Sequence, residues 1–198
     1  MTSQRAGDGR GVCIWLTGPG GAGKSTLTAS LVPMLESTGA EVTVLDVVPE
    51  LEKMPGERTS RGKLIRKAFV SKEVVRHGGV VVCVTISSTR EIREQARSMV
   101  GEDSFVEVFV DAPADVVAKR KAERPKKPAL RKRVRRSLKA VAARFGLEGE
   151  GGYERPLHPD VHVQTTRMSP VEGAELVMAA LAKGGKISWD PAGQRSQS

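Results

Sequence analysis

A lysine and a hydroxyl pair close a glycine-rich segment near the start of the chain, in an arrangement that is typical of phosphate binding. Residues 18–25, GPGGAGKS, fit the pattern G-x-x-x-x-G-K-[ST] at every fixed position. In such a loop, successive backbone N–H groups turn inward around an anion, and the dipole of the following helix adds to the attraction. We expect the phosphates of ATP to be bound by Gly18, Pro19, Gly20, Gly21, Ala22, Gly23, Lys24, Ser25 and Thr26.

Two members of this segment have chemical roles in the prediction. Lys24 reaches the β- and γ-phosphates, where its charge acts on the transferred group, and the Ser25 hydroxyl is a ligand of Mg²⁺. The flanking residues supply the elements that the loop needs. Residues 12–16 are apolar, as in a buried strand, and residues 25–35 carry apolar side chains at helical spacing. A glycine-rich turn with a chance lysine is the alternative, and the agreement of motif and context argues against it.

A carboxylate follows the second predicted strand. Residues 42–45, VTVL, form a strand that we expect to neighbour the strand of the phosphate loop. They end at Asp46, which should lie at the same edge of the sheet as that loop. A carboxylate in this place can orient an attacking hydroxyl and take its proton, so Asp46 is predicted to be catalytic. In the alternative, Asp46 only holds a magnesium-bound water or caps a turn, and the sequence leaves both roles open.

The elements that position these residues alternate between strands and helices along the chain. This order predicts an α/β fold of the P-loop NTPase type, with a parallel sheet flanked by helices on both faces. Continuous apolar runs such as VVVCVTI at residues 80–86 are typical of strands that are buried on both faces. The other expected elements are strands at 105–110 and 161–164 and helices at 63–77, 91–100, 114–121 and 170–182.

The 198 residues suit one domain, which we place at 11–182 between flexible tails at 1–10 and 183–198. Cys13 and Cys83 lie in apolar runs and are expected to be buried free thiols, with no disulfide or zinc site. We find neither a membrane-spanning run nor the apolar core of a signal peptide, and we therefore expect a cytoplasmic protein without membrane contact. A net charge of +9 favours an anionic partner.

One segment departs from the composition of the rest. Residues 119–139 contain twelve Lys or Arg and a single Glu. They could form a solvated helical face, an arm for nucleic acid, or a lid that closes over ATP. The segment lacks aromatic side chains on which bases could stack, which argues against nucleic acid. We favour the lid, in which Arg120 binds ATP and neutralises charge on the transferred phosphoryl group, with Arg124 as a further candidate.

The motifs together resemble the adenylylsulfate kinase family. Its opening, a Trp-x-Thr-Gly lead into Gly-Ala-Gly-Lys-Ser-Thr, is similar to IWLTGPGGAGKST, and the order and spacing of further segments agree over roughly residues 12–182. These segments are VTVLD, LIRKAF, ISSTREIREQAR, FVEVFVDAP and YERPLHPDVHVQT. The resemblance implies ATP and Mg²⁺ as cofactors, transfer of the γ-phosphoryl group to the 3′-hydroxyl of adenylylsulfate, a role in sulfate assimilation, and a homodimer, which the family often forms.

The resemblance also implies residues that bind the acceptor, which is a small anion. Arg66 matches an arginine that contacts the sulfonucleotide, Ser87 matches a serine at the substrate site, and Arg90 follows on the same loop. Arg58 or Arg61 replaces a further arginine. The alternatives are that the arginines are helix-surface charges and that Ser87 caps the turn after its strand.

Two family patterns are incomplete. The family reads Leu-Asp-Gly-Asp, with an arginine three residues after the second Asp, whereas this chain has Leu45-Asp46-Val47-Val48 and then Leu51. The family's lid contains Arg-Asp-x-Lys-Gly-Leu-Tyr, of which this chain keeps Arg120. The missing residues belong to the acceptor and the lid. The resemblance implies adenylylsulfate as the acceptor. Because residues of the acceptor side are missing, another nucleotide-linked or acidic metabolite is the alternative. A non-catalytic nucleotide- or nucleic-acid-binding protein is the third reading.

Overall fold

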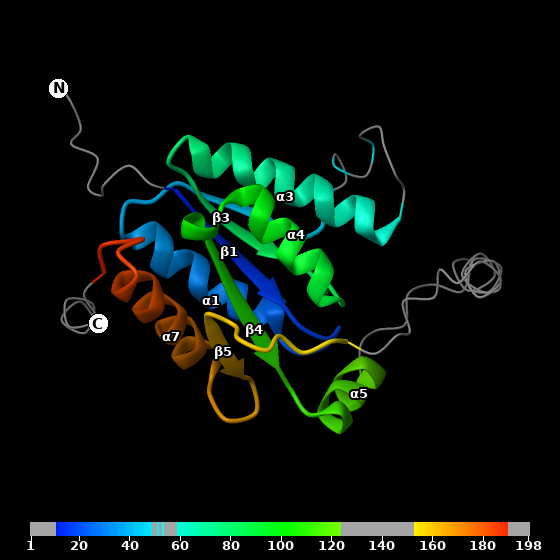
Figure 1. Ribbon diagram of the computed structural model, residues 1–198. Coiled ribbons are helices and arrows are strands. Elements are labelled where there is room, and N and C mark those ends of the chain that lie inside the picture. The colour runs from blue at the N-terminus through cyan, green and yellow to red at the C-terminus, as the bar shows by residue number, and fades with distance from the viewer. Residues whose placement is uncertain (1–10, 49–50, 52, 54–58, 124–152, 190–198) are drawn as a thin grey trace, which may run out of the picture.

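The computed structural model describes residues 11–48, 51, 53, 59–123 and 153–189. Within them, five parallel strands form one sheet in the order β2-β3-β1-β4-β5 (Figure 1). Because the strands are parallel, their carboxyl ends meet at a single edge, where ligands of open α/β sheets bind. The strands are β1 (Val12–Thr17), β2 (Val42–Leu45), β3 (Val80–Val84), β4 (Phe105–Asp111) and β5 (Val161–Gln164).

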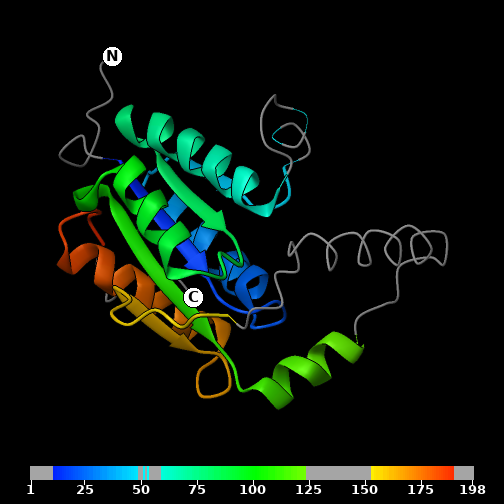
Figure 2. The same ribbon diagram turned by 45° about the vertical axis from the view of Figure 1, so that its right-hand side comes forward.

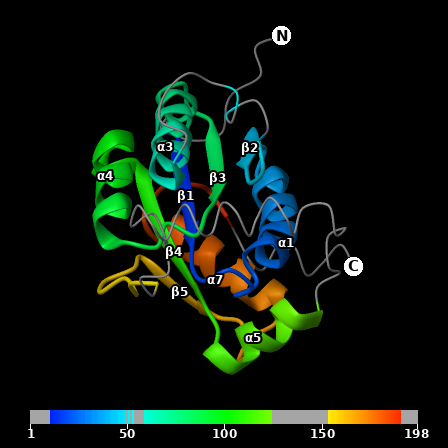
Figure 3. The ribbon, with the colours of Figure 1, turned by 90° about the vertical axis from the view of Figure 1, so that its right-hand side faces the viewer.

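Helices cover both faces of the sheet. Seen from its edge in Figure 3, the sheet has α3 (Ser60–Arg76) and α4 (Arg90–Val100) on one side. The helices α1 (Lys24–Ser37) and α7 (Pro170–Lys183) lie on the other. A further helix, α5 (Ala114–Glu123), follows β4 and lies beyond the carboxyl end of that strand, apart from both layers (Figure 2). A 3₁₀ turn at Glu102–Ser104 leads into β4.

The apolar pattern of the central strand explains the two layers. Successive side chains of a strand point to opposite faces, so a strand covered on both sides must be apolar throughout. Val12, Ile14 and Leu16 belong to the cluster under α1 and α7, while Cys13 and Trp15 belong to the cluster under α3 and α4. The sheet is thus fixed from both faces, and the loops at its carboxyl edge start from a rigid base.

Side-chain caps set the starts of three helices. Thr59 accepts a hydrogen bond from the Gly62 N–H at the start of α3, and Thr89 accepts one from the Ile92 N–H at the start of α4. Ser169 begins α7 with a reciprocal capping box. Such caps satisfy N–H groups that have no partner inside the helix. The Thr59 cap explains why α3 begins at Ser60, three residues before the predicted start.

The predicted α/β fold, with its parallel sheet and helices on both faces, is confirmed. The third strand ends at Val84 and not at residue 86, because the chain after Thr85 turns into a loop. Cys13 and Cys83 are buried and free, as predicted, and burial raises the pKa of both thiols, that of Cys13 to about 12.

The ends of the predicted domain are described only in part. Ile187 and Trp189, which the sequence places in the flexible C-terminal tail, pack against the core under α1 and α7. The other tail residues, at 1–10 and 190–198, and the lid residues 124–139 lie outside the described part of the chain. Among the described residues, no helix combines the length and the apolar character that crossing a bilayer requires.

Candidate active site

The glycine-rich loop joins β1 to α1 at the carboxyl edge of the sheet (Figure 1). Gly18 has φ 150°, and a Cβ there would overlap the carbonyl oxygen of Val110 on β4. Gly23 has φ 109° and is the N-cap of α1. Both positions favour glycine because side chains rarely adopt these backbone angles. The loop can therefore pass close to β4 and deliver the N-terminus of α1 to a bound anion.

Lys24 is folded back over this loop. Its ammonium group donates to the carbonyl oxygens of Gly18 at 2.7 Å and Pro19 at 2.9 Å, and the residue is 8% exposed. Lysine is almost never this buried unless its charge is paired or solvated by oxygen atoms. The contacts hold the positive charge of Lys24 at the centre of the loop.

Ser25 and Asp46 come from different elements and meet at the same edge. Ser25, in the first turn of α1, donates a hydrogen bond of 3.4 Å to Oδ2 of Asp46, which follows β2. A hydroxyl and a carboxylate oxygen side by side are ligands that Mg²⁺ prefers. The contact places Asp46 near the predicted metal ligand, and it leaves both alternatives for Asp46 open, base or metal-organising group.

Lys67 on α3 fixes the backbone that carries Asp46. Its ammonium group donates to three carbonyl oxygens, at 2.9 Å to Leu45, 2.5 Å to Asp46 and 2.9 Å to Val84. These contacts cross-link the carboxyl ends of β2 and β3. The sequence gives no signal for this role, because lysines on helices are usually solvent-exposed.

A cleft of about 390 Å³ opens on the other side of the phosphate loop, between the loop, Arg120 and the end of β5. Its volume lies in the range of small-molecule sites. The Arg120 guanidinium donates to Oγ1 of Thr165 at 3.0 Å and to the Ala22 carbonyl at 3.3 Å, so Arg120 forms one wall. The lining residues are Gly21, Gly23, Thr26, Leu27, Arg120, Val163, Thr165, Met168, Ser169 and Pro170.

The predicted acceptor residues are spread over two elements of the opposite layer. Arg66 is half-buried on α3, and Arg90 is exposed at the start of α4. Arg61 forms an ion pair of 2.8 Å with Glu91 on α4, and Arg58 lies outside the described residues. The acceptor roles of Arg58, Arg66 and Arg90 stay predictions.

Ser87 is almost fully buried in the loop that follows β3, which we name the 85–90 loop for its residues. Its hydroxyl oxygen accepts hydrogen bonds from Thr85 Oγ1 at 2.8 Å and from the Trp15 indole N–H at 3.2 Å, and the hydroxyl shares a further hydrogen bond of 2.7 Å with Thr17 Oγ1. Ser87 also has φ 36°, a left-handed conformation that is uncommon outside glycine. The hydroxyl is thus engaged in holding the loop, while its predicted contact with the acceptor stays a prediction.

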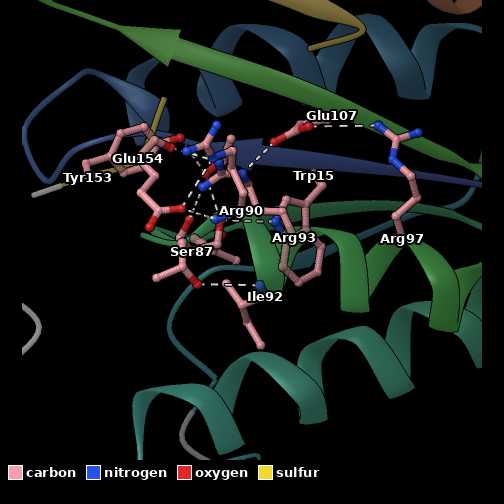
Figure 4. A network of polar contacts seen from close by, with 12 residues as sticks. Trp15, Ser87, Arg90, Ile92, Arg93, Arg97, Glu107, Tyr153 and Glu154 are labelled. Carbon is pink, nitrogen blue, oxygen red and sulfur yellow. Dashed lines mark hydrogen bonds and ion pairs between the residues drawn. The ribbon is translucent and has the colours of Figure 1, made fainter. Parts of the chain in front are cut away.

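A buried arginine and glutamate lie behind this loop (Figure 4). Nε of Arg93 on α4 is 2.8 Å from Oε1 of Glu107 on β4, and both residues are at least 90% buried. Burial raises the pKa of the Glu107 carboxyl above its ordinary value, and Arg93 opposes that shift. The segment after residue 152 also joins the network, because the Tyr153 hydroxyl shares a 2.8 Å hydrogen bond with Thr17 and its ring stacks on Phe109.

Sequence reasoning missed these partners, although one signal was present. Glu107 interrupts the apolar run FVEVFV, and a glutamate within a buried strand requires a charged partner. Nothing in the sequence shows that Arg93, and not another basic residue, is that partner. Thr165 likewise had no signal, since its contacts with Arg120 depend on the packing of α5.

The chain is similar to known proteins over most of its length. A family model described as adenylylsulphate kinase matches residues 10–164. A probable adenylyl-sulfate kinase of Pyrococcus abyssi is 36% identical over 176 residues, covering 85% of this chain and 93% of the relative. The adenylyl-sulfate kinase of Synechococcus sp. strain JA-3-3Ab is 35% identical over 183 residues, covering 90% and 98%.

A solved structure shares the fold. The APS kinase of Mycobacterium tuberculosis, in complex with AMPPNP and APS, superposes with a TM-score of 0.65 and is 26% identical. The match covers 87% of this chain and 98% of that one.

Proposed function

We propose, from the premise that this chain belongs to the adenylylsulfate kinase family, that it transfers the γ-phosphoryl group of ATP to the 3′-hydroxyl of adenylylsulfate. The family consists of ATP-dependent phosphotransferases that act on a hydroxyl group. Its relatives match almost the whole chain, so the family activity applies to the domain as a unit.

The observation that carries the proposal is the meeting of Lys24, Ser25 and Asp46 at one edge of the sheet. Two of them lie on consecutive residues of the phosphate loop, and Asp46 lies 3.4 Å from the Ser25 hydroxyl. Phosphoryl transfer needs positive charge on the transferred group, a place for the metal and a carboxylate near the attacking hydroxyl. The three side chains supply these functions within a small volume.

On the donor side, we assign the triphosphate to residues 18–26 and the adenosine to the cleft beside Arg120 and Thr165. The cleft is continuous with the loop, since Gly21, Gly23 and Thr26 belong to both. Arg120 is held in place by two different segments and can therefore offer a fixed cationic face to the nucleotide. ATP bound in this way directs its γ-phosphate toward Lys24.

In the reaction, Asp46 orients the 3′-hydroxyl and accepts its proton as the oxygen attacks the γ-phosphorus, and the bond to the β–γ bridging oxygen breaks. Lys24 stabilises the charge that spreads over the transferred group. The residues present fit Mg²⁺, because the Ser25 hydroxyl and the Asp46 carboxylate are adjacent oxygen donors. Bound with ATP, Mg²⁺ neutralises phosphate charge. Among the described residues, no cluster of three or more acidic, histidine or cysteine side chains offers a separate metal site.

On the acceptor side, we assign Arg66 and Arg90 to the anionic part of adenylylsulfate, with Arg58 as a further contact. Arginine suits this role because its planar group binds oxyanions in a bidentate manner. A different anionic acceptor is favoured by one observation. Val47, where the family has glycine, directs an apolar side chain that is 80% exposed to solvent beside Asp46.

The experiment that tests the proposal is product identification. The purified chain is incubated with Mg²⁺, ATP and adenylylsulfate, and the product is analysed by ³¹P NMR for a phosphate ester at the 3′-carbon. We expect one ADP per 3′-phosphorylated product, formed about 10²–10³-fold more slowly with Lys24→Ala. ATP consumption without this ester, or ester formation only with another acceptor, would contradict the assignment.

We also propose that the protein is a homodimer and that it is located in the cytoplasm. Light scattering of the purified chain tests the first: a mass of twice 21.2 kDa is expected. A monomeric mass in the presence of both substrates would overturn it.

A further inference from the structure

We infer that Arg93 is a positioning residue for the acceptor: it holds the 85–90 loop in the conformation that presents Arg90 to the site. The inference rests on the proposed function, because it names a residue that acts on acceptor binding through another residue. Arg93 itself is 3% exposed and does not reach the surface at which the acceptor binds.

Three segments meet at the Arg93 guanidinium (Figure 4). Nη1 donates to the Ser87 carbonyl at 2.6 Å, Nη2 donates to the Glu154 carbonyl at 2.7 Å, and Nε is 2.8 Å from Glu107 Oε1. One contact holds the 85–90 loop and one holds the segment after residue 152. The third anchors the guanidinium to β4, in the middle of the sheet.

The 85–90 loop depends on such contacts for its shape. Ser87 occupies a left-handed conformation at φ 36°, which persists only where the surroundings over-determine it. The Arg93 hydrogen bond is to the carbonyl of this same residue. Without it, the backbone at Ser87 can relax, and the residues that follow, including Arg90, lose their fixed direction.

Arg93 also supports the hydrogen bond between Arg90 and Glu154. The Arg90 N–H donates to Glu154 Oε2 at 2.8 Å, and the Glu154 N–H donates to the Ser88 carbonyl at 2.8 Å. Since Arg93 also binds the Glu154 carbonyl, both sides of this contact are held by one guanidinium. The three acceptors bind three different nitrogen atoms of the Arg93 guanidinium, whereas the three donors of an ammonium group share one nitrogen, so lysine should not reach all three.

Arg97 provides a matched control on the same helix, four residues further on. It forms an ion pair of 2.7 Å with Asp160, lies 4.9 Å from the centre of the Phe105 ring, and is 3.9 Å from Oε2 of Glu107. Asp160 and Phe105 are at the amino-terminal ends of β5 and β4, at the opposite edge of the sheet from the 85–90 loop. Removing Arg97 therefore takes one positive charge away from the same Glu107 carboxylate, while the contacts of Arg93 with Ser87 and Glu154 stay in place.

The test compares Arg93→Met, Arg93→Lys, the double variant Arg93→Met with Glu107→Leu, and Arg97→Met. We measure KM for adenylylsulfate and for ATP, the thermal midpoint, and amide hydrogen exchange at 85–90 with a non-hydrolysable ATP analogue bound. Replacing a buried ion pair by apolar side chains often preserves stability, so the double variant separates folding from positioning.

We expect Arg93→Met and Arg93→Lys to raise the KM for adenylylsulfate about tenfold or more, while the KM for ATP stays within about threefold. The double variant should recover the thermal midpoint and keep the raised KM, and amide exchange at 85–90 should be faster. Arg97→Met should leave both KM values near wild type. If Arg93→Met does not fold, the KM for adenylylsulfate and the amide exchange of the double variant test the inference.

The inference is overturned if the double variant regains the wild-type KM, if both KM values rise together, or if Arg97→Met raises the acceptor KM equally. Amide exchange does not depend on the acceptor. If the wild-type chain does not phosphorylate adenylylsulfate, the proposed function fails, and unchanged exchange at 85–90 in the variants is the separate result that overturns the positioning role.

Discussion

The proposed donor side of the site takes its phosphate-binding groups from consecutive residues, 18–26, whereas the proposed acceptor side is assembled from four segments. Asp46 follows β2, Arg66 lies on α3, the 85–90 loop follows β3, and the segment from Tyr153 to Arg155 runs beside β4. The donor loop depends on backbone geometry that glycine allows. The acceptor side depends on side chains that cross-link distant backbone segments.

The two sides therefore differ in what a substitution must preserve. The donor loop requires a particular residue type, glycine, whereas the acceptor side requires contacts that fix the position of a side chain. In the donor loop, a Cβ at Gly18 would overlap a neighbouring strand, so the constraint acts at a single residue. On the acceptor side, the position of Arg90 depends on Glu154, Ser87 and Arg93 together. A change at any of them should alter acceptor binding before it alters ATP binding.

The largest effect should follow from Lys24→Ala. Loss of the charge that stabilises the transferred group should lower kcat by about 10²–10³-fold, because a single electrostatic stabiliser normally contributes that much. Steady-state kinetics measure it, with Lys183→Ala, an exposed lysine at the end of α7, as the control. Turnover within about tenfold of wild type would show that the donor loop does not act through this lysine.

Asp46→Asn tests the group that both sides share. Removing the base should lower kcat by about 10²-fold with little change in the KM for ATP. A titration with Mg²⁺ distinguishes the roles, since a carboxylate that only organises the metal would be replaced in large part by raising its concentration. Asp103→Asn, at the opposite edge of the sheet, is the control and should be neutral.

Leu51→Arg should improve acceptor binding without changing ATP binding. The family has an arginine at this position, and one added charge-assisted contact is worth about 1.5–3 kcal/mol, or roughly ten- to a hundredfold in affinity. The KM for adenylylsulfate should fall by about tenfold or more, with the KM for ATP unchanged. Leu176→Arg on α7 adds the same charge away from the site. An equal effect of both substitutions would mean that only net charge matters.

The smallest effect concerns Tyr153, which ties the acceptor side to β1. Burial raises its pKa from 10 to about 12, so the folded chain holds the phenolic proton more tightly than the unfolded chain. The stability from this group is complete below pH 10 and is lost as the pH rises from 10 to about 12.

Tyr153→Phe should therefore show a shallower loss of unfolding free energy over this pH interval, measured by urea denaturation. Cys13, whose pKa also lies near 12, is present in both proteins, so the difference isolates the tyrosine. Equal slopes for the two proteins would contradict the burial of the Tyr153 phenol, which is the cause of the raised pKa.

The same contrast explains how much the sequence predicts. The fold and the phosphate loop follow from local signals, namely apolar runs such as VVVCV and the spacing of Gly18, Gly23 and Lys24. Asp46 was predictable because it follows a strand whose carboxyl end lies at the same edge of the sheet as the loop. The expectation that this strand neighbours β1 is wrong, because β3 lies between β2 and β1. Arg93 and Lys67 were not, because a basic residue on a helix is usually a surface charge, and their partners lie on other elements of the fold.

The central claim is tested most directly by a comparison of acceptors at saturating ATP and Mg²⁺. We measure kcat/KM for adenylylsulfate, for adenosine 5′-monophosphate, which has the 3′-hydroxyl and lacks the sulfate, and for a panel of other anionic alcohols. We predict the highest kcat/KM for adenylylsulfate, with 3′-phosphorylated product. A higher value for any other acceptor, or ATP turnover that no acceptor accelerates, would contradict it.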